Sequence, residues 1–86
     1  MKAVKVYTKD YCPYCSAAKN LLKGKGIAFT EVDMQEMSDS DIEALAKLTN
    51  SYRTVPQIFI GDEFIGGFDQ LRALDSSGKL DEKLKE

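Results

Sequence analysis

Residues 3–22 read AVKVYTKDYCPYCSAAKNLL, and the spacing of the apolar residues changes in the middle of this stretch. Over residues 3–7, Val4 and Val6 lie two positions apart, which is typical of a half-buried strand. From Pro13 onward the apolar residues recur at helical period, and proline suits the first position of a helix. The stretch therefore predicts a strand, a short loop and a helix, with two cysteines where the helix begins.

The rest of the chain continues this alternation. A second strand is expected over residues 27–33, and the SDIE sequence of residues 40–43 fits the capping box of a second helix, whose buried face would carry Ile42, Leu45 and Leu48. Two short apolar runs flank a Gly-Asp turn and predict a hairpin, which is followed by a third helix. The predicted order is β-α-β-α-β-β-α, and four strands with helices on both faces of a mixed sheet is its most economical packing.

Length and composition limit the class of protein. The 86 residues, 43% hydrophobic and 30% charged, predict a single domain over residues 1–86 with a shallow groove as its site. A net charge of −2 gives no reason to expect nucleic acid as a partner, although residues 1–25 hold six lysines against Asp10 alone. No apolar run is long enough for a signal peptide or a membrane span, so we expect the protein in a reducing cytoplasm. A monomer is the default expectation for a domain of this size.

The two cysteines decide the chemistry. A structural zinc site normally has four cysteine or histidine ligands, and a chain with two cysteines and no histidine disfavours a metal site within one molecule. A purely structural disulfide between Cys12 and Cys15 would close a very short loop and would stabilise the fold only slightly. A C-x-x-C pair beside a β-α-β pattern is instead typical of a redox site.

The predicted position of Cys12 favours its thiolate. Cys12 would lie just before the helix and Cys15 in its first turn, so that the two sulfur atoms come within bonding reach. Unpaired N–H groups and the positive end of the helix dipole would face Cys12, and Lys9 would add a positive charge. Such surroundings lower the pKa of a thiol from about 8.5 into the range of ~3.5–7.5. A stabilised thiolate also leaves more easily when a second thiol attacks its mixed disulfide.

Three motifs occur in the order of the predicted elements: CPYC at residues 12–15, TVP at 54–56 and GGFD at 66–69. Together they resemble the glutaredoxins of the dithiol class, over nearly the whole chain. The resemblance implies a thioredoxin-like α/β fold. It also implies a glutathione-dependent thiol–disulfide oxidoreductase that reduces glutathione mixed disulfides and protein disulfides, with glutathione as co-substrate and no metal.

The resemblance assigns roles to individual residues. Cys12 would be the nucleophile and Cys15 the resolving thiol. The residues that would bind glutathione are Lys9, Tyr14, Thr54, Val55, Pro56, Gly67, Phe68 and Asp69.

Within this set, each part of glutathione has its own partners. Val55, beside a cis Pro56, would pair its backbone with the cysteinyl part as an added strand would. The amides of Phe68 and Asp69 would bind the γ-glutamyl carboxylate at a helix N-terminus, and the Asp69 carboxylate would bind the ammonium. Lys9 would face the glycyl carboxylate.

Two positions leave questions open. Arg53 is either a contact of the glycyl carboxylate or a solvated surface residue. Many dithiol glutaredoxins carry a second acid where this chain has Gln70. The loss of that charge would weaken the attraction for the γ-glutamyl ammonium.

Two other functions are compatible with the same motifs. Two Cys12 thiolates and two glutathiones could hold a [2Fe–2S] cluster across a dimer, although Pro13 and Tyr14 make the loop stiff and bulky for that purpose. The protein could also donate electrons to ribonucleotide reductase and be reduced by thioredoxin reductase rather than by glutathione. A coupled assay that compares the two reductants separates this last alternative.

Overall fold

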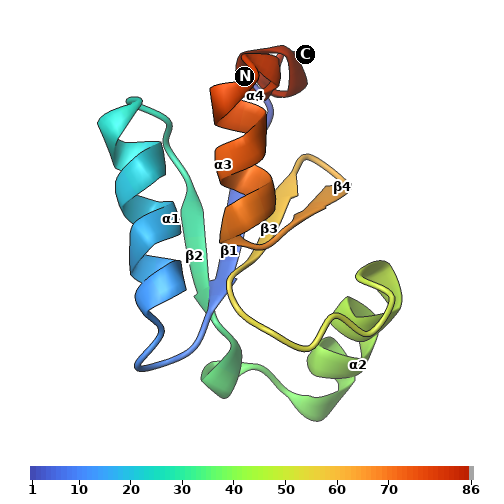
Figure 1. The fold of residues 1–86 in the computed structure, drawn as a ribbon. Coiled ribbons are helices and arrows are strands. Elements are labelled where there is room, and N and C mark those ends of the chain that lie inside the picture. Colours follow the sequence, from blue (N-terminus) through green and yellow to red (C-terminus); the bar gives the residue numbers. More distant parts are fainter. Residues whose placement is uncertain (86) are drawn as a thin grey trace.

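The computed structural model describes residues 1–85 as a four-stranded sheet flanked by helices (Figure 1). The elements, in chain order, are β1 (Val4–Thr8), α1 (Pro13–Gly24), β2 (Thr30–Asp33), the 3₁₀-helix η1 (Met34–Glu36), α2 (Asp39–Leu48), β3 (Gln57–Ile60), β4 (Glu63–Gly66), α3 (Phe68–Ser76) and α4 (Lys79–Leu84). The strands lie side by side in the order β2-β1-β3-β4.

The sheet is mixed, as the sequence predicted. Strand β1 is parallel to β2 and antiparallel to β3, and β3 is antiparallel to β4. The two-residue turn at Gly61 and Asp62 joins β3 to β4, and Gly61 has a φ of +58°, in the left-handed region that glycine adopts readily. The thioredoxin-like fold class is therefore confirmed.

The main core lies between the sheet and helices α1 and α3. It is built from side chains that alternate along the strands or recur at helical spacing. Its buried members are Val4, Val6, Ala18, Leu22, Ile27, Ile58, Ile60, Leu71, Leu80 and Leu84. Burying each of the larger of these side chains contributes about 1.5–3 kcal/mol, so this layer supplies most of the fold's stability.

Helix α2 lies on the opposite side of the sheet, where its Leu45 and the strand residues Tyr7 and Val32 line a common pocket. Its side chains at Ile42, Leu45 and Leu48 were predicted to form the buried face, but Leu48 is 67% exposed. The reason is helical phase, since three residues turn a helix by 300°. Leu48 therefore points about 120° away from Ile42, whereas Thr49 continues the buried stripe.

Two element boundaries also differ from those predicted. Ser38, not Ser40, caps α2, because its Oγ accepts a hydrogen bond of 3.2 Å from the Asp41 N–H. The second strand starts at Thr30 rather than at residue 27. Ile27 instead donates its N–H to the Leu22 carbonyl at 2.9 Å, in the turn that follows the end of α1.

Candidate active site

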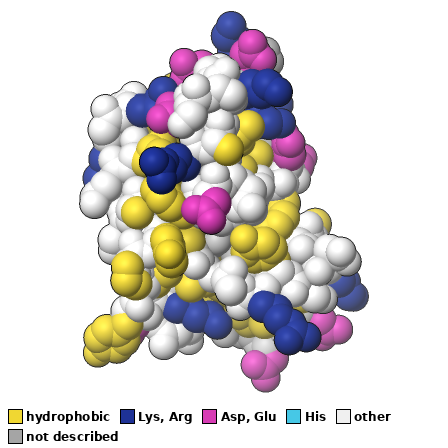
Figure 2. Space-filling view, viewed as in Figure 1, with side chains coloured by type: hydrophobic (Ala, Val, Ile, Leu, Met, Phe, Trp, Pro, Cys, Tyr) yellow, Lys and Arg dark blue, Asp and Glu magenta, His cyan; other side chains and the backbone are white. Residues whose placement is uncertain are grey.

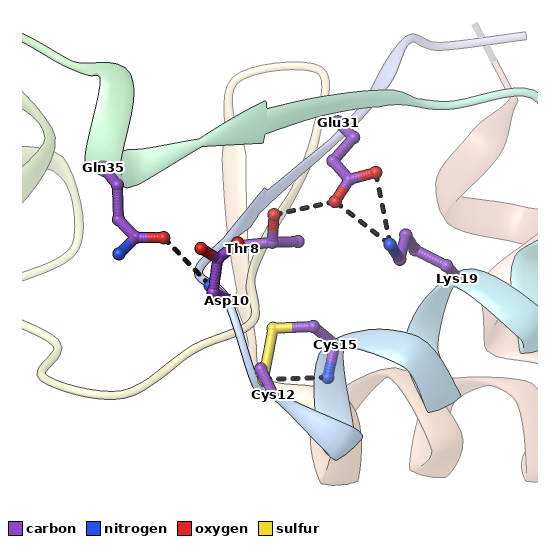
Figure 3. A network of polar contacts seen from close by, with 7 residues as sticks. All are labelled: Thr8, Asp10, Cys12, Cys15, Lys19, Glu31 and Gln35. Carbon is purple, nitrogen blue, oxygen red and sulfur yellow. Dashed lines mark hydrogen bonds and ion pairs between the residues drawn. A yellow bond between two sulfur atoms is a disulfide. The ribbon is translucent and has the colours of Figure 1, made fainter.

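The two cysteines lie where α1 begins. Cys12 is the N-cap residue and Cys15 lies in the first turn, so their Cα atoms are 5.2 Å apart and a disulfide joins their sulfur atoms (Figure 3). Cys15 is buried, whereas Cys12 is partly exposed. Of the two sulfur atoms, that of Cys12 is the one an incoming reagent can reach.

The start of α1 surrounds the Cys12 sulfur with positive partial charge. The Cys15 N–H donates to Cys12 Sγ at 3.0 Å, and Pro13 occupies the first helical position. The first turn of α1 contains no acidic side chain, so nothing on it neutralises the positive end of the helix dipole. When the disulfide is reduced, this geometry stabilises a thiolate at Cys12.

A groove lies beside the cysteines. Its volume is about 270 Å³, and it is lined by Tyr14, Tyr52, Thr54, Val55, Pro56, Gly67, Phe68, Asp69 and Gln70. Cys12 Sγ lies 3.6 Å from the Val55 carbonyl oxygen, which places the reactive sulfur against one wall of the groove. The Val55–Pro56 peptide bond is cis.

Two aromatic rings form part of the groove's wall on the α1 and α3 side. The Tyr14 and Phe68 ring centroids are 6.3 Å apart, and Tyr14 is 62% exposed. Tyr11, in the loop before Cys12, is fully exposed. Figure 2, which has the same viewpoint as Figure 1, shows hydrophobic side chains at the surface in the lower half of the molecule, with Lys and Arg side chains near them.

The N-terminus of α3 forms the far end of the groove. Gly67 is the N-cap residue, and its N–H donates to Gln70 Oε1 at 2.9 Å, which holds the first turn in place. Gly66 has a φ of +120°, and a Cβ on it would lie 2.9 Å from Gln70 Cγ. Glycine is therefore required at position 66 both for its backbone conformation and for space.

Most of the residues predicted to bind a ligand line this one groove. They are Tyr14, Thr54, Val55, Pro56, Gly67, Phe68 and Asp69. Lys9 is exposed and does not line the groove, and neither does Arg53. Tyr52 lines the groove but was not predicted, and its only signal in the sequence is its position two residues before the TVP motif. Gln70 was noted as a departure, and its structural role at the start of α3 was not predicted.

A second set of polar contacts lies near the cysteines (Figure 3). The Thr8 hydroxyl donates to Glu31 Oε2 at 2.8 Å, and Lys19 forms an ion pair with the same carboxylate at 3.1 Å. The Thr8 hydrogen bond, followed by that of Lys19, lowers the pKa of Glu31 from its ordinary value. Farther along, Gln35 Oε1 accepts from the Asp10 N–H at 3.1 Å and ties η1 to the loop before Cys12.

The part of the chain that the structure describes, residues 1–85, contains no group of three or more histidine, cysteine, aspartate or glutamate side chains that could hold a metal ion. Over the same residues, no helix is long and apolar enough to cross a membrane.

Comparisons with known proteins agree with the geometry. The family model described as Glutaredoxin matches residues 4–65. Glutaredoxin 3 of Escherichia coli K12 is 45% identical over 85 residues, which cover 99% of this chain and all of that protein. A glutaredoxin of Pseudomonas aeruginosa is 43% identical over 81 residues, 94% of each chain.

Solved structures give the same result. A buckwheat glutaredoxin–glutathione complex superposes with a TM-score of 0.84 at 36% identity, over 96% of this chain and 76% of that one. The glutaredoxin of Brucella melitensis superposes with a TM-score of 0.81 at 44% identity, over 99% of this chain and 90% of that one.

Proposed function

The chain belongs to the glutaredoxin family and is a thiol–disulfide oxidoreductase, and we propose that it uses glutathione to reduce glutathione mixed disulfides and protein disulfides. The observation that carries the proposal is the position of Cys12 Sγ, capped by the start of α1 and 3.6 Å from the Val55 carbonyl at the groove wall. The similar buckwheat protein forms a complex with glutathione, which supports glutathione as the ligand of the groove. We place this activity in a single domain, in a reducing cytoplasm.

Reduction of a glutathione mixed disulfide needs only one cysteine. The Cys12 thiolate attacks the glutathione sulfur, a new S–S bond forms between Cys12 and glutathione, and the substrate leaves as a thiolate that takes up a proton. A second glutathione thiolate then attacks the glutathione sulfur of this intermediate. Glutathione disulfide forms, and the electron pair of the broken bond returns to Cys12 as a thiolate, which the start of α1 stabilises.

Reduction of a protein disulfide also needs Cys15. Once Cys12 is joined to the substrate, the Cys15 thiolate attacks the Cys12 sulfur and expels the second substrate thiolate. The product is the reduced substrate together with the Cys12–Cys15 disulfide seen in this structure. Two glutathione molecules then return the pair to the dithiol form and leave as glutathione disulfide.

In this proposal the groove binds glutathione and positions its sulfur atom beside Cys12. Val55 offers backbone hydrogen bonds to the cysteinyl part of glutathione beside Cys12, and Tyr14 and Pro56 contact its apolar atoms. The N–H groups of Phe68 and Asp69 at the start of α3 bind the γ-glutamyl carboxylate, and the Asp69 carboxylate attracts the ammonium. Thr54 contributes to the same wall, and exposed Lys9 attracts the glycyl carboxylate from outside the groove.

The Cys15→Ser variant tests this division of labour. We expect it to keep glutathione-dependent reduction of the mixed disulfide between glutathione and 2-mercaptoethanol, since that reaction uses Cys12 alone. It should fail to reduce an intramolecular disulfide such as that of a two-cysteine peptide. Ser16→Ala, which changes a neighbouring exposed residue, serves as the control and should keep both activities. Loss of both activities in a folded Cys15→Ser protein would overturn the proposed roles.

A further inference from the structure

Three oxygen atoms meet beside Gly67, at the α3 end of the groove. A Cβ on this glycine would lie 2.9 Å from Tyr52 Oη and 3.5 Å from both Gln70 Oε1 and the Pro56 carbonyl oxygen. These atoms come from three separate segments: the loop after α2, the first turn of α3 and the residue before β3. All four residues line the groove. The fold therefore gathers three potential hydrogen-bond acceptors at one place.

Tyr52 is held at this place from several sides. Its ring packs edge-on against Phe64, with 5.1 Å between the centroids, and its carbonyl accepts a hydrogen bond of 3.0 Å from the Gln57 amide. The Tyr52 N–H donates to Thr49 Oγ1 at 3.4 Å. Gln57 is 3% exposed, so the anchor is part of the packed interior. Within residues 1–85 the Tyr52 hydroxyl makes no hydrogen bond, and it is therefore available to a ligand in the groove.

We propose that Tyr52 Oη, together with Gln70 Oε1 and the Pro56 carbonyl oxygen, binds the α-ammonium of the ligand's γ-glutamyl end. This inference rests on the proposed use of glutathione. An ammonium has three N–H donors and no acceptor, which matches a site built from oxygen atoms. Gln70 Oε1 already accepts from the Gly67 N–H, and its second lone pair remains for the ligand.

The placement also agrees with the other charge at that end of the ligand. The carboxylate and ammonium of a γ-glutamyl group sit on one carbon atom, so their binding sites must be adjacent. The N–H groups that open α3 follow Gly67 directly and suit the carboxylate, and the oxygen atoms around Gly67 suit the ammonium. Asp69 lines the same groove and supplies the negative charge that the neutral Tyr52 and Gln70 lack. Tyr52 is thus a specificity-determining residue for ligands that carry an α-ammonium.

The experiment compares two mixed disulfides of 2-mercaptoethanol, one with glutathione and one with glutaryl-cysteinylglycine, which lacks only the α-ammonium. The variant is Tyr52→Phe, which keeps the ring against Phe64 and removes only the hydroxyl. A typical net hydrogen bond is worth about a three- to tenfold change in KM, and we take this range because the groove is open to solvent. We expect the KM of Tyr52→Phe to rise by that factor for the glutathione compound, with kcat unchanged, and to stay constant for the glutaryl compound.

The control variant is Tyr7→Phe, which removes a tyrosine hydroxyl on the α2 face of the sheet, away from the groove. It should leave both KM values unchanged. An equal rise for the two compounds in Tyr52→Phe, or no rise for either, would overturn the assignment of Tyr52 to the ammonium. Failure of the unaltered protein to turn over the glutathione compound would instead overturn the proposed function itself.

Discussion

The two ends of the sheet differ in how they are built. At one end, here called the cysteine end, lie the loop from β1 to α1, Cys12 and the Val55–Pro56 segment (Figure 1). Tyr11 is fully exposed there and has a φ of +56°, a conformation that is uncommon for a bulky side chain.

The opposite end, here called the terminal end, holds α4 and both chain termini (Figure 1). The Lys2 N–H donates to the Leu84 carbonyl at 2.7 Å, and Leu80 and Leu84 are buried. Ion pairs also join α3 and α4 to neighbouring segments, with Lys25 at 2.6 Å from Asp75 and 4.0 Å from Asp81, and Lys83 at 2.7 Å from Glu63.

This difference separates function from stability. The cysteine end exposes reactive and irregular groups on loops, and the core and the terminal end hold those loops in position. Substitutions at the cysteine end should therefore change activity with little effect on the free energy of unfolding. Substitutions at the terminal end should lower the free energy of unfolding with little effect on the activity of the molecules that remain folded.

The largest expected effect is that of Cys12→Ser at the cysteine end. Removal of the nucleophile should abolish the reduction of both mixed disulfides and protein disulfides. The side chain is only partly buried and the change is nearly isosteric, so the loss of packing should change the free energy of unfolding of the reduced protein by no more than about 0.5 kcal/mol. Near neutral pH the variant also loses the folding stability that the Cys12 thiolate contributes, and this second loss disappears at low pH, where the thiol is protonated in both the folded and the unfolded chain. Activity assays and urea unfolding under reducing conditions at several pH values measure these quantities. A Cys12→Ser protein that is strongly destabilised at low pH would show that the two ends are not separable.

The next largest effect is that of Leu80→Ala at the terminal end. Leu80 is almost fully buried in the core, and truncation of such a leucine costs about 2–5 kcal/mol. Urea unfolding should show this loss, while kcat per folded molecule stays unchanged. Leu48→Ala removes a largely exposed leucine from α2 and should shift stability by less than about 0.5 kcal/mol. Loss of kcat in folded Leu80→Ala would contradict the claim that the terminal end contributes to stability and not to activity.

The smallest effect concerns Glu31, near the cysteine end. Its pKa is lowered in the folded protein by Thr8 and Lys19, so it binds a proton less readily there than in the unfolded chain. The resulting stability is present above the ordinary pKa of 4.5 and is lost as the pH falls through the lower, folded value. Because the ion pair is partly exposed to solvent, which screens it, we expect this contribution to be at most about 1 kcal/mol.

Urea unfolding between pH 7 and pH 3 measures this contribution. Glu31→Gln should flatten the pH dependence of stability relative to the unaltered protein. Glu43→Gln, which removes a carboxylate from the exposed side of α2, is the matched control and should not flatten it. Identical curves for the two variants would remove the role of the Thr8–Glu31–Lys19 contacts in acid stability.

Local patterns predicted the elements well where one segment carried the whole signal. Pro13 begins α1 and the turn at Gly61 joins two strands, because backbone restrictions act at the residue itself. The patterns were less reliable where neighbours compete. Ser38 and Ser40 are both suitable caps, and only the geometry of the following turn selects Ser38. Leu48 fits an apolar spacing of three residues, but the phase of α2 on the sheet leaves it exposed.

The candidate site shows the same limit. The groove residues were predicted only through the motifs that resemble a known family, and the binding roles of these residues remain predictions. Lys9 lies outside the groove lining, and Tyr52 inside it. Nothing in the sequence around Tyr52 indicates that its hydroxyl lies beside Gly67, fifteen residues farther along the chain.

The sequence by itself determined the order of the four strands and of helices α1 to α3, but not η1 or α4, and it determined the pairing of Cys12 with Cys15. Hydrophobic period and three-residue spacing at a helix start are local properties. Only the tertiary structure decided that Val55 lies against a sulfur 43 residues away, and that Tyr52, Pro56 and Gln70 meet at Gly67. The physical reason is that such contacts depend on which strands pair and on which face each helix packs. Those choices are made by the packing of the whole core and not by any one segment.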